Sequence, residues 1–152
     1  KIWFTSELGK GTTFYFTISK WFIMKKLKRV MVIDDDLFTN IYLEIILNQN
    51  NITKNIVTFQ DGKKALEFLA ANTNKVDLIL LDINMPKMNG WRFLKEFQKL
   101  HKKITATILI VMLTSSENIR DQKKAEKLQI VKKFVKKPLN EKIVNEIVNL
   151  NN

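Results

Sequence analysis

Five short apolar segments, each followed by a stretch with helical spacing of apolar residues, constrain the fold of this chain more than any other feature. We expect strands at 30–33, 55–59, 76–81, 106–113 and 131–135. Most of these runs are continuously apolar, as in parallel strands that are covered on both faces. Parallel strands need long crossovers, and the helical stretches supply them. The pattern therefore predicts a doubly wound α/β domain, with helices on both faces of one parallel sheet.

The stretches between the strands repeat apolar residues every three or four positions, as amphipathic helices do. The first carries its stripe at Phe38, Ile41, Tyr42, Ile45 and Ile46, which we expect to face the core. The later stripes are Ala65, Leu66, Phe68 and Leu69; Trp91, Phe93, Leu94, Phe97 and Leu100; Ile119, Ala125 and Leu128; and Ile143, Val144, Ile147 and Val148. Asp36 is predicted to start the first helix, and Asn140 to cap the last.

The composition narrows the possible classes of protein. A chain of 152 residues with 45% hydrophobic content can form one domain with a real core, and perhaps a small appendage. It contains no cysteine and a single histidine, which excludes disulfides, thiolate metal sites and sites built from paired histidines. Its apolar runs are shorter than the roughly 20 residues that span a bilayer. We expect a cytoplasmic protein with no membrane contact.

The formal net charge of +11 raises the question of an anionic partner. Residues 120–142 hold nine basic residues and three acidic ones. Our first interpretation is a solvated helix face; an acidic protein partner and a weak nucleic-acid contact remain alternatives. Nucleic-acid binding is disfavoured, because no recognition module follows Leu150 and the basic residues lack interleaved aromatic residues for base stacking.

Polar residues follow the predicted strands where they would meet at one edge of the sheet. Asp34 and Asp35 follow the first strand, Asp82 the third, Thr114 the fourth and Lys137 the fifth. Clustered carboxylates repel one another unless a cation offsets their charge. A hard divalent ion such as Mg²⁺, with oxygen ligands, offers that compensation. With this help Asp82 could attack a phosphoryl group and form an acyl phosphate, with the Thr114 hydroxyl donating to the phosphoryl.

These residues carry a family resemblance. Asp34-Asp35, Asp82, the run 84–90, Thr114-Ser115 and Lys137-Pro138 resemble the receiver domain of two-component response regulators, over about residues 27–150. The resemblance implies the strand order 2-1-3-4-5 and a cis peptide bond before Pro138.

The same resemblance implies a role for each site residue. Asp82 would be the phosphoacceptor. Asp35 would bind Mg²⁺ directly, Asp34 through a water and Asn84 through its backbone carbonyl. Thr114 and Lys137 would hold the phosphoryl oxygens, and Phe134 would follow the movement of Thr114 as a switch.

The implied partners are a histidine kinase or a histidine phosphotransfer protein, and a downstream protein bound through the last two helices and the fifth strand. The domain would lose its phosphoryl group slowly by itself and would contain no intact kinase. Three other interpretations are weaker: a haloacid-dehalogenase-type phosphatase, a flavodoxin-like FMN carrier and a nucleic-acid-binding domain. Phe38 stands where that phosphatase family prefers Thr or Val, and three carboxylates would repel the FMN phosphate.

The first 18 residues read as two alternating strands around Gly9-Lys10-Gly11. They resemble the last hairpin of the ATP-binding domain of sensor histidine kinases, a fragment that cannot phosphorylate anything alone. We expect a hairpin fragment at 1–20, a linker at 21–28 and a receiver at 29–150, with Trp3, Phe14 and Phe16 exposed. The chain could be the receiver module of a hybrid kinase, or Met24 could be the natural start of a free-standing receiver.

Overall fold

The computed structural model describes residues 2–16, 27–71, 76–100, 105, 107–116 and 118–150. Its main body is a five-stranded parallel sheet with the order β4-β3-β5-β6-β7, the expected 2-1-3-4-5. The strands are β3 (Val30–Ile33), β4 (Ile56–Phe59), β5 (Leu78–Asp82), β6 (Leu109–Thr114) and β7 (Val131–Lys136). The helices are α1 (Leu37–Gln49), α2 (Gly62–Ala71), α3 (Gly90–Phe97), α5 (Ile119–Glu126) and α6 (Glu141–Asn149).

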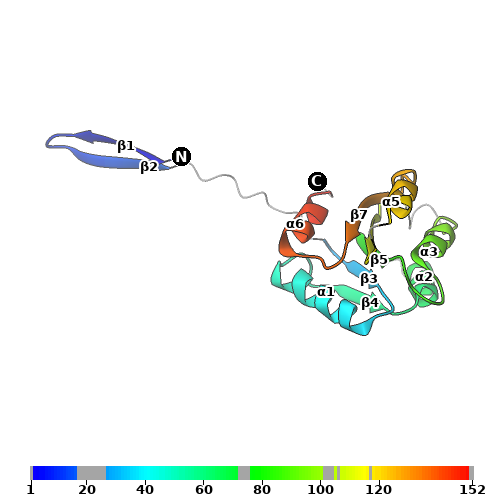
Figure 1. The fold of residues 1–152 in the computed structure, drawn as a ribbon. Helices are drawn as coiled ribbons and strands as arrows, with labels where there is room; N and C mark the ends of the chain where they lie inside the picture. The colour runs from blue at the N-terminus through cyan, green and yellow to red at the C-terminus, as the bar shows by residue number, and fades with distance from the viewer. Residues whose placement is uncertain are drawn as a thin grey trace.

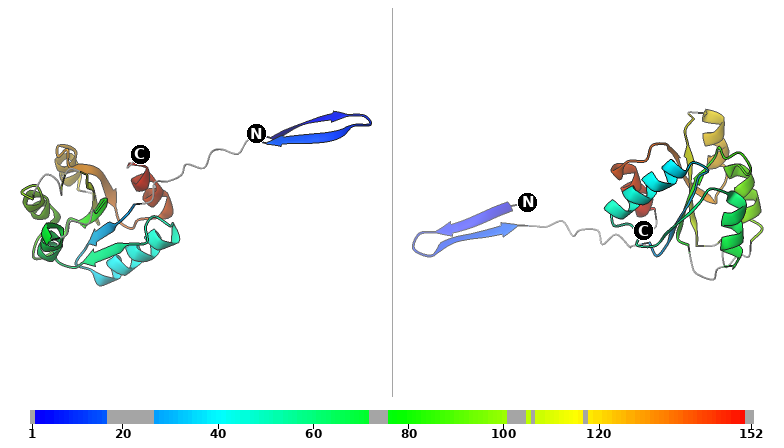
Figure 2. Two further views of the ribbon diagram at one scale, coloured as in Figure 1. Left: turned by 180° about the vertical axis from the view of Figure 1, so that it is seen from behind. Right: turned by 90° about the horizontal axis from the view of Figure 1, so that it is seen from below.

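The helices cover both faces of the sheet, as predicted (Figure 1). Helices α1 and α6 lie on one face and α2, α3 and α5 on the other, which the two further views make clear (Figure 2). The strands supply alternate side chains to the two resulting cores: Val30 and Val32 of β3 join the first core, and Met31 and Ile33 the second. Strands β3 and β5 are buried along their whole length, which explains their continuous apolar sequence.

The predicted orientation of α1 is wrong. The helix forms, but Phe38 is 80% exposed, and Ile41, Tyr42 and Ile45 are each more than 40% exposed. The buried side is Asn40, Leu43, Ile46 and Leu47 instead, so only Ile46 of the predicted stripe lies in the core. Since α1 has apolar residues on both sides, helical spacing alone cannot choose the inner one. The outer stripe of Leu37, Phe38, Ile41, Tyr42 and Ile45 is called the α1 apolar face below.

The first strands form the predicted hairpin. Strands β1 (Ile2–Glu7) and β2 (Gly11–Phe16) are antiparallel, and both Gly9 in the turn and Gly11 at the start of β2 have positive φ. Trp3 is 47% and Phe14 68% exposed, as expected; the side chain of Phe16 and most of the expected linker lie outside the described residues. The rings of Trp3 and Tyr15 stack with centroids 5.5 Å apart.

Leu27 belongs to the main body, since it is buried and its backbone N–H donates to the Ile52 carbonyl oxygen. Among the described residues, no helix is both long enough and apolar enough to cross a membrane.

Candidate functional site

The predicted site residues lie at one edge of the sheet. Asp34 follows β3, Asp82 ends β5, Thr114 ends β6 and Lys137 follows β7. The strand register aligns these ends, since Ile33 pairs with Leu81, Asp82 with Leu113 and Thr114 with Lys136. The chain order reverses between β3 and β5, and a doubly wound sheet leaves its ligand crevice at such a point.

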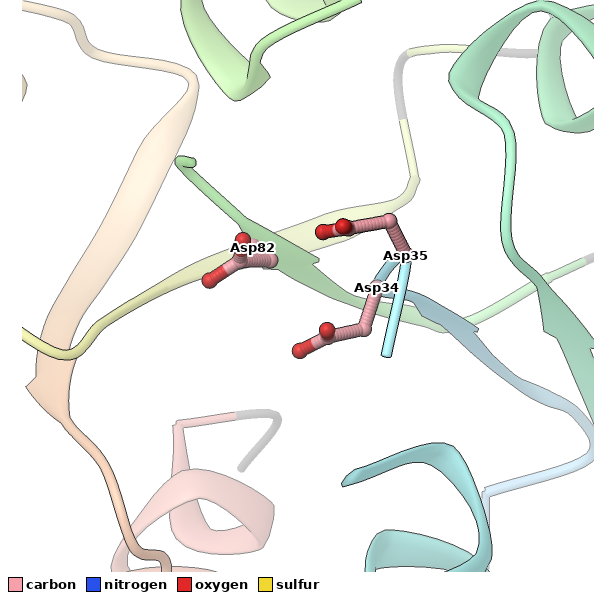
Figure 3. A group of neighbouring side chains, drawn as sticks. All are labelled: Asp34, Asp35 and Asp82. Carbon is pink, nitrogen blue, oxygen red and sulfur yellow. The ribbon is translucent and has the colours of Figure 1, made fainter. Parts of the chain in front are cut away.

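Three carboxylates converge at this edge. Asp34, Asp35 and Asp82 each offer an oxygen, and these oxygens lie within 4.8 Å of one another. Figure 3 shows the three side chains reaching into a common space from the ends of β3 and β5. Asp34 is 1% and Asp82 3% exposed, whereas Asp35 is exposed to solvent. The group is called the carboxylate pocket below.

Lys137 neutralises part of this charge. Its ammonium forms ion pairs with Asp34 and with Asp82, and the Nζ–Oδ1 distance to Asp82 is 2.7 Å. Burial acts to lower the pKa of Lys137, but hydrogen bonds to both carboxylates and their charges outweigh it and raise the pKa. Burial raises the pKa of Asp34 above its ordinary value, although the hydrogen bond and charge of Lys137 oppose that rise. One ammonium against three carboxylates leaves the pocket with an excess of negative charge.

Short turns hold the two buried carboxylates in place. The backbone N–H of Asp36 donates to Asp34 Oδ1 at 3.1 Å, and that of Asn84 donates to Asp82 Oδ2 at 2.9 Å. Asp36 itself caps α1, accepting hydrogen bonds from the backbone N–H groups of Phe38 and Thr39. Its expected role at the helix start is confirmed, and it is not one of the three clustered carboxylates.

The other predicted residues border the pocket in different ways. Thr114 is buried, and its hydroxyl oxygen accepts from the backbone N–H of Ser116 at 3.0 Å. Asn84 is exposed next to Asp82, and Phe134 is partly buried in β7. The Lys137–Pro138 peptide bond is cis, as predicted.

Sequence reasoning did not find the supporting roles of Asn40, Tyr42 and Gly90, although Tyr42 and Gly90 stand in patterns that it had named. The Asn40 side-chain amide donates to the backbone carbonyl of Asp34 at 2.7 Å, and its own buried Oδ1 accepts no hydrogen bond from the residues that the structure describes. The Tyr42 hydroxyl donates to the carbonyl of Leu139 at 2.6 Å, which ties α1 to the loop that carries Lys137. Gly90 lies so close to β5 that an added Cβ would be 2.6 Å from the Asp82 carbonyl oxygen. The sequence offered one signal for Asn40, namely its position as a polar residue within a largely apolar helix.

Comparison with known proteins agrees with this geometry. The family described as "Response regulator receiver domain" matches residues 30–149, most of the chain. The chain belongs to the response regulator receiver domain family. The receiver match begins after the hairpin, so the kinase resemblance of residues 1–20 stays a prediction.

Solved receiver structures share the fold. A two-component response regulator from Cytophaga hutchinsonii is 31% identical with a TM-score of 0.77, covering 84% of this chain and 98% of that one. A response regulator receiver protein from Dyadobacter fermentans is 25% identical with a TM-score of 0.73, covering 81% and 96%.

Curated relatives are longer proteins. A protein-glutamate methylesterase/protein-glutamine glutaminase from Geobacillus kaustophilus is 31% identical over 115 residues, 76% of this chain but 31% of that protein. A second such enzyme, from Vibrio vulnificus, is 38% identical over 79 residues, which is 22% of its length. The chain thus spans under a third of either relative, and both alignments fall within the length of a receiver domain.

The receiver's carboxylate pocket has the chemistry of a divalent cation site. Its donors are carboxylate oxygens, the ligands that hard cations prefer, and its negative charge exceeds what Lys137 compensates. Asp35 is exposed, so an ion can reach the pocket from solvent. The arrangement can therefore hold a metal ion beside a buried carboxylate that is already paired with an ammonium.

Proposed function

We propose that this receiver domain accepts a phosphoryl group on Asp82 from a phosphohistidine of a histidine kinase or a histidine phosphotransfer protein. One observation carries the proposal: the buried Asp82 carboxylate lies beside two further carboxylates and forms an ion pair with the ammonium of Lys137. In the reaction an Asp82 oxygen forms a bond to phosphorus, the phosphorus–nitrogen bond breaks, and the histidine nitrogen leaves with the bonding pair and takes up a proton.

Asp34, Asp35 and Asp82, with the Asn84 backbone carbonyl, would hold Mg²⁺. When bound, this ion would offset the negative charge of the carboxylates and of the phosphoryl oxygens. The contact of Lys137 with Asp82 supports a role in which its ammonium would hold a phosphoryl oxygen. Thr114 would give up its hydrogen bonds with Ser116 to donate to another, and Phe134 would then shift with it.

Phosphorylation with acetyl phosphate tests the proposal. Wild-type protein with Mg²⁺ should gain one phosphoryl group by intact mass, and Asp82→Asn should gain none. Asp36→Asn is the matched control, because it removes a carboxylate from the same acidic run outside the pocket, and it should be modified like wild type. Equal modification of wild type and Asp82→Asn, or modification without Mg²⁺ at the same rate, would contradict the mechanism.

The donor would approach over the α1 apolar face. Exposed apolar residues in contiguous patches mark protein-binding surfaces. This face borders the site, because a cavity of about 270 Å³ is lined by Phe38 and Tyr42 of α1 together with Lys137 and Pro138. Phe38→Ser should therefore slow phosphotransfer from a donor protein while leaving modification by acetyl phosphate unchanged.

The output would be a change in affinity for a downstream protein at β7, α5 and α6. The self-catalysed loss of the phosphoryl group would be slow and would reset this surface. The cellular setting would be cytoplasmic, where a kinase and Mg²⁺ are available. As a receiver module of a hybrid kinase the domain would perform the same reaction, since the site lies wholly within residues 34–137.

A further inference from the structure

Two side-chain amides donate to the backbone of the two consecutive aspartates in the carboxylate pocket. The Asn40 amide donates to the carbonyl of Asp34 at 2.7 Å. The Gln60 amide donates to the carbonyl of Asp35 at 3.1 Å. In both bonds the acceptor is a peptide group and not a carboxylate, so the amides can fix the backbone without occupying the carboxylate oxygens. Asn40 and Gln60 are called the amide clamp below.

The backbone needs support at this point, because Asp34 and Asp35 both face the pocket (Figure 3). Consecutive side chains of an extended strand point to opposite faces of the sheet. The chain therefore bends at Asp35, directly after β3, and this bend brings two negative side chains to the same side. Repulsion between the two carboxylates opposes the bend, so other contacts must hold it while no cation is bound.

Local structure fixes both amides relative to the bend. Asp36 caps α1, and the backbone N–H of Asn40 donates to the Asp36 carbonyl at 3.1 Å, so Asn40 lies one helical turn beyond the cap. Gln60 directly follows β4, the strand that pairs with β3. There the backbone N–H of Asp34 donates to the Phe59 carbonyl at 3.0 Å. One amide thus approaches the bend from a helix and the other from the end of the neighbouring strand.

The energetics of Asn40 separate this role from ordinary stabilisation of the fold. Asn40 is 2% exposed, and its Oδ1 accepts no hydrogen bond within the described part of the chain. Leaving a buried acceptor unpaired costs at least as much free energy as an average hydrogen bond contributes. The Asn40 amide therefore adds little net stability, whereas its bond to the Asp34 carbonyl acts directly on the geometry of the pocket.

We propose that Asn40 and Gln60 are positioning residues, which hold the bend at Asp34 and Asp35 in the conformation that fits a small divalent cation. The inference rests on the proposed function for taking the three carboxylates as a Mg²⁺ site. Mg²⁺ requires nearly ideal octahedral geometry at short distances, whereas Ca²⁺ accepts longer and more variable ones. Loss of the amide clamp should therefore weaken Mg²⁺ binding more than Ca²⁺ binding. A loss of overall stability does not change that selectivity.

The test measures the affinity of the unphosphorylated full-length chain for Mg²⁺ and for Ca²⁺, through amide NMR shifts during titration with each chloride salt. Asn40→Ala and Gln60→Met each remove one donor of the amide clamp, and the second keeps a side chain of similar length. Asn50→Ala is the matched control, because it removes an amide bond of the same kind, to the Ile46 carbonyl at 2.8 Å, at the far end of α1. Urea unfolding without divalent ions gives the stability of each variant.

For Asn40→Ala we expect a Mg²⁺ dissociation constant about tenfold above that of wild type, the usual effect of losing a residue that orients a metal ligand. The Ca²⁺ dissociation constant should rise by less than about threefold, because Ca²⁺ coordination is more flexible. Gln60→Met should change both constants in the same direction but less, since water can replace an exposed amide. Asn50→Ala should lower the urea midpoint and leave both dissociation constants at their wild-type values.

Four results would overturn the inference. Wild-type Mg²⁺ affinity in Asn40→Ala would show that the carboxylates keep their places without the amide, and the proposed function would stand. An equal loss of Mg²⁺ affinity in Asn50→Ala, or equal losses for Mg²⁺ and Ca²⁺ in Asn40→Ala, would assign the effect to overall stability. Absence of Mg²⁺ binding in wild type would remove the cation site of the proposed function together with this inference. If Asn40→Ala does not fold, the same criteria apply to Gln60→Met.

Discussion

The carboxylate pocket and the exposed cations beside the groove between α5 and β7 (Arg120, Lys123, Lys127 and Lys132) each concentrate charge of one sign, but the environments of these charges differ. In the pocket the charges are buried, and Lys137 contacts two of the three carboxylates. Around the groove most cations are exposed, and several have no ion-pair partner among the described residues. Desolvation makes an unpaired buried charge costly, whereas water stabilises an exposed one. Burial therefore requires that the charges in the pocket be paired, whereas water stabilises the cations beside the groove without an ion-pair partner.

Removing one ammonium from each region tests this difference most directly. Lys137→Met leaves Asp34 and Asp82 buried without their cation, so we expect a loss of about 3 kcal/mol in unfolding free energy at pH 8. Lys132→Met should change it by less than about 0.5 kcal/mol. Urea unfolding measures both. The deficit of Lys137→Met should shrink at pH 5, because burial raises the pKa of Asp34 and the folded state therefore binds more protons there than the unfolded state. Equal losses of unfolding free energy in the two variants would show that burial does not determine the cost of removing a lysine.

Mg²⁺ should stabilise the pocket and not the groove. At a concentration of 100 times its dissociation constant, an ion that binds only the folded state adds about 2.7 kcal/mol. We expect Mg²⁺ to raise the melting temperature of wild type and of Lys132→Met alike. In Asp35→Asn, which lacks the exposed carboxylate of the pocket, the increase should be much smaller. If Mg²⁺ raised the melting temperature of Asp35→Asn as much as that of wild type, the ion would bind outside the carboxylate pocket.

The backbone at Gly90 lies too close to the carbonyl oxygen of Asp82 to leave space for a side chain. Gly90→Ala puts a methyl group against the Asp82 carbonyl oxygen, with a separation of 2.6 Å before relaxation, so we expect a loss of about 1–3 kcal/mol. Gly62→Ala is the matched control, because its new Cβ would meet the flexible end of Met88 at 3.2 Å. Thermal unfolding of both variants checks this. A larger loss in Gly62→Ala would contradict it.

The smallest expected effect belongs to the exposed pair on the groove side. The hydrogen bond and charge of Lys133 lower the pKa of Glu146 from its ordinary 4.5. A lowered acid pKa means that the pair stabilises the fold above pH 4.5 and that this contribution is lost as pH falls through the folded pKa. The melting temperature of Glu146→Gln should therefore be slightly below that of wild type at pH 7. The two melting temperatures should become equal at low pH. A difference in melting temperature between Glu146→Gln and wild type that grows as the pH falls would contradict the stabilising role of this ion pair.

The parts of the molecule that could be predicted are those where one residue pattern has one physical solution. Apolar runs as continuous as 30–33 and 78–81 must be covered on both sides, and the structure buries both strands entirely. Polar residues directly after such strands must share an edge, which brought Asp34, Asp82 and Lys137 together.

The remaining features depend on tertiary contacts that no local pattern encodes. Both sides of α1 are apolar, so its spacing fitted two orientations, and the sheet buries the side that includes Asn40. The bond from Tyr42 to Leu139 spans 97 residues, and the Lys133–Glu146 pair joins a strand to a helix. Strand β6 begins at Leu109, later than the apolar run suggests, because hydrophobic character does not mark where hydrogen bonding to a neighbour begins.

The hydrogen bond between Tyr42 and Leu139 has a consequence for energetic linkage across the molecule. It joins a surface-exposed aromatic side chain to the segment immediately after Lys137 and Pro138. A protein bound on the outside of α1 would contact the side chain of Tyr42, so its binding would be linked through this bond to the segment after Lys137, whose ammonium pairs with Asp34 and Asp82. Because linkage between two binding free energies is reciprocal, a cation held by the three carboxylates would then change the affinity for that protein by the same factor by which the protein changes the affinity for the cation.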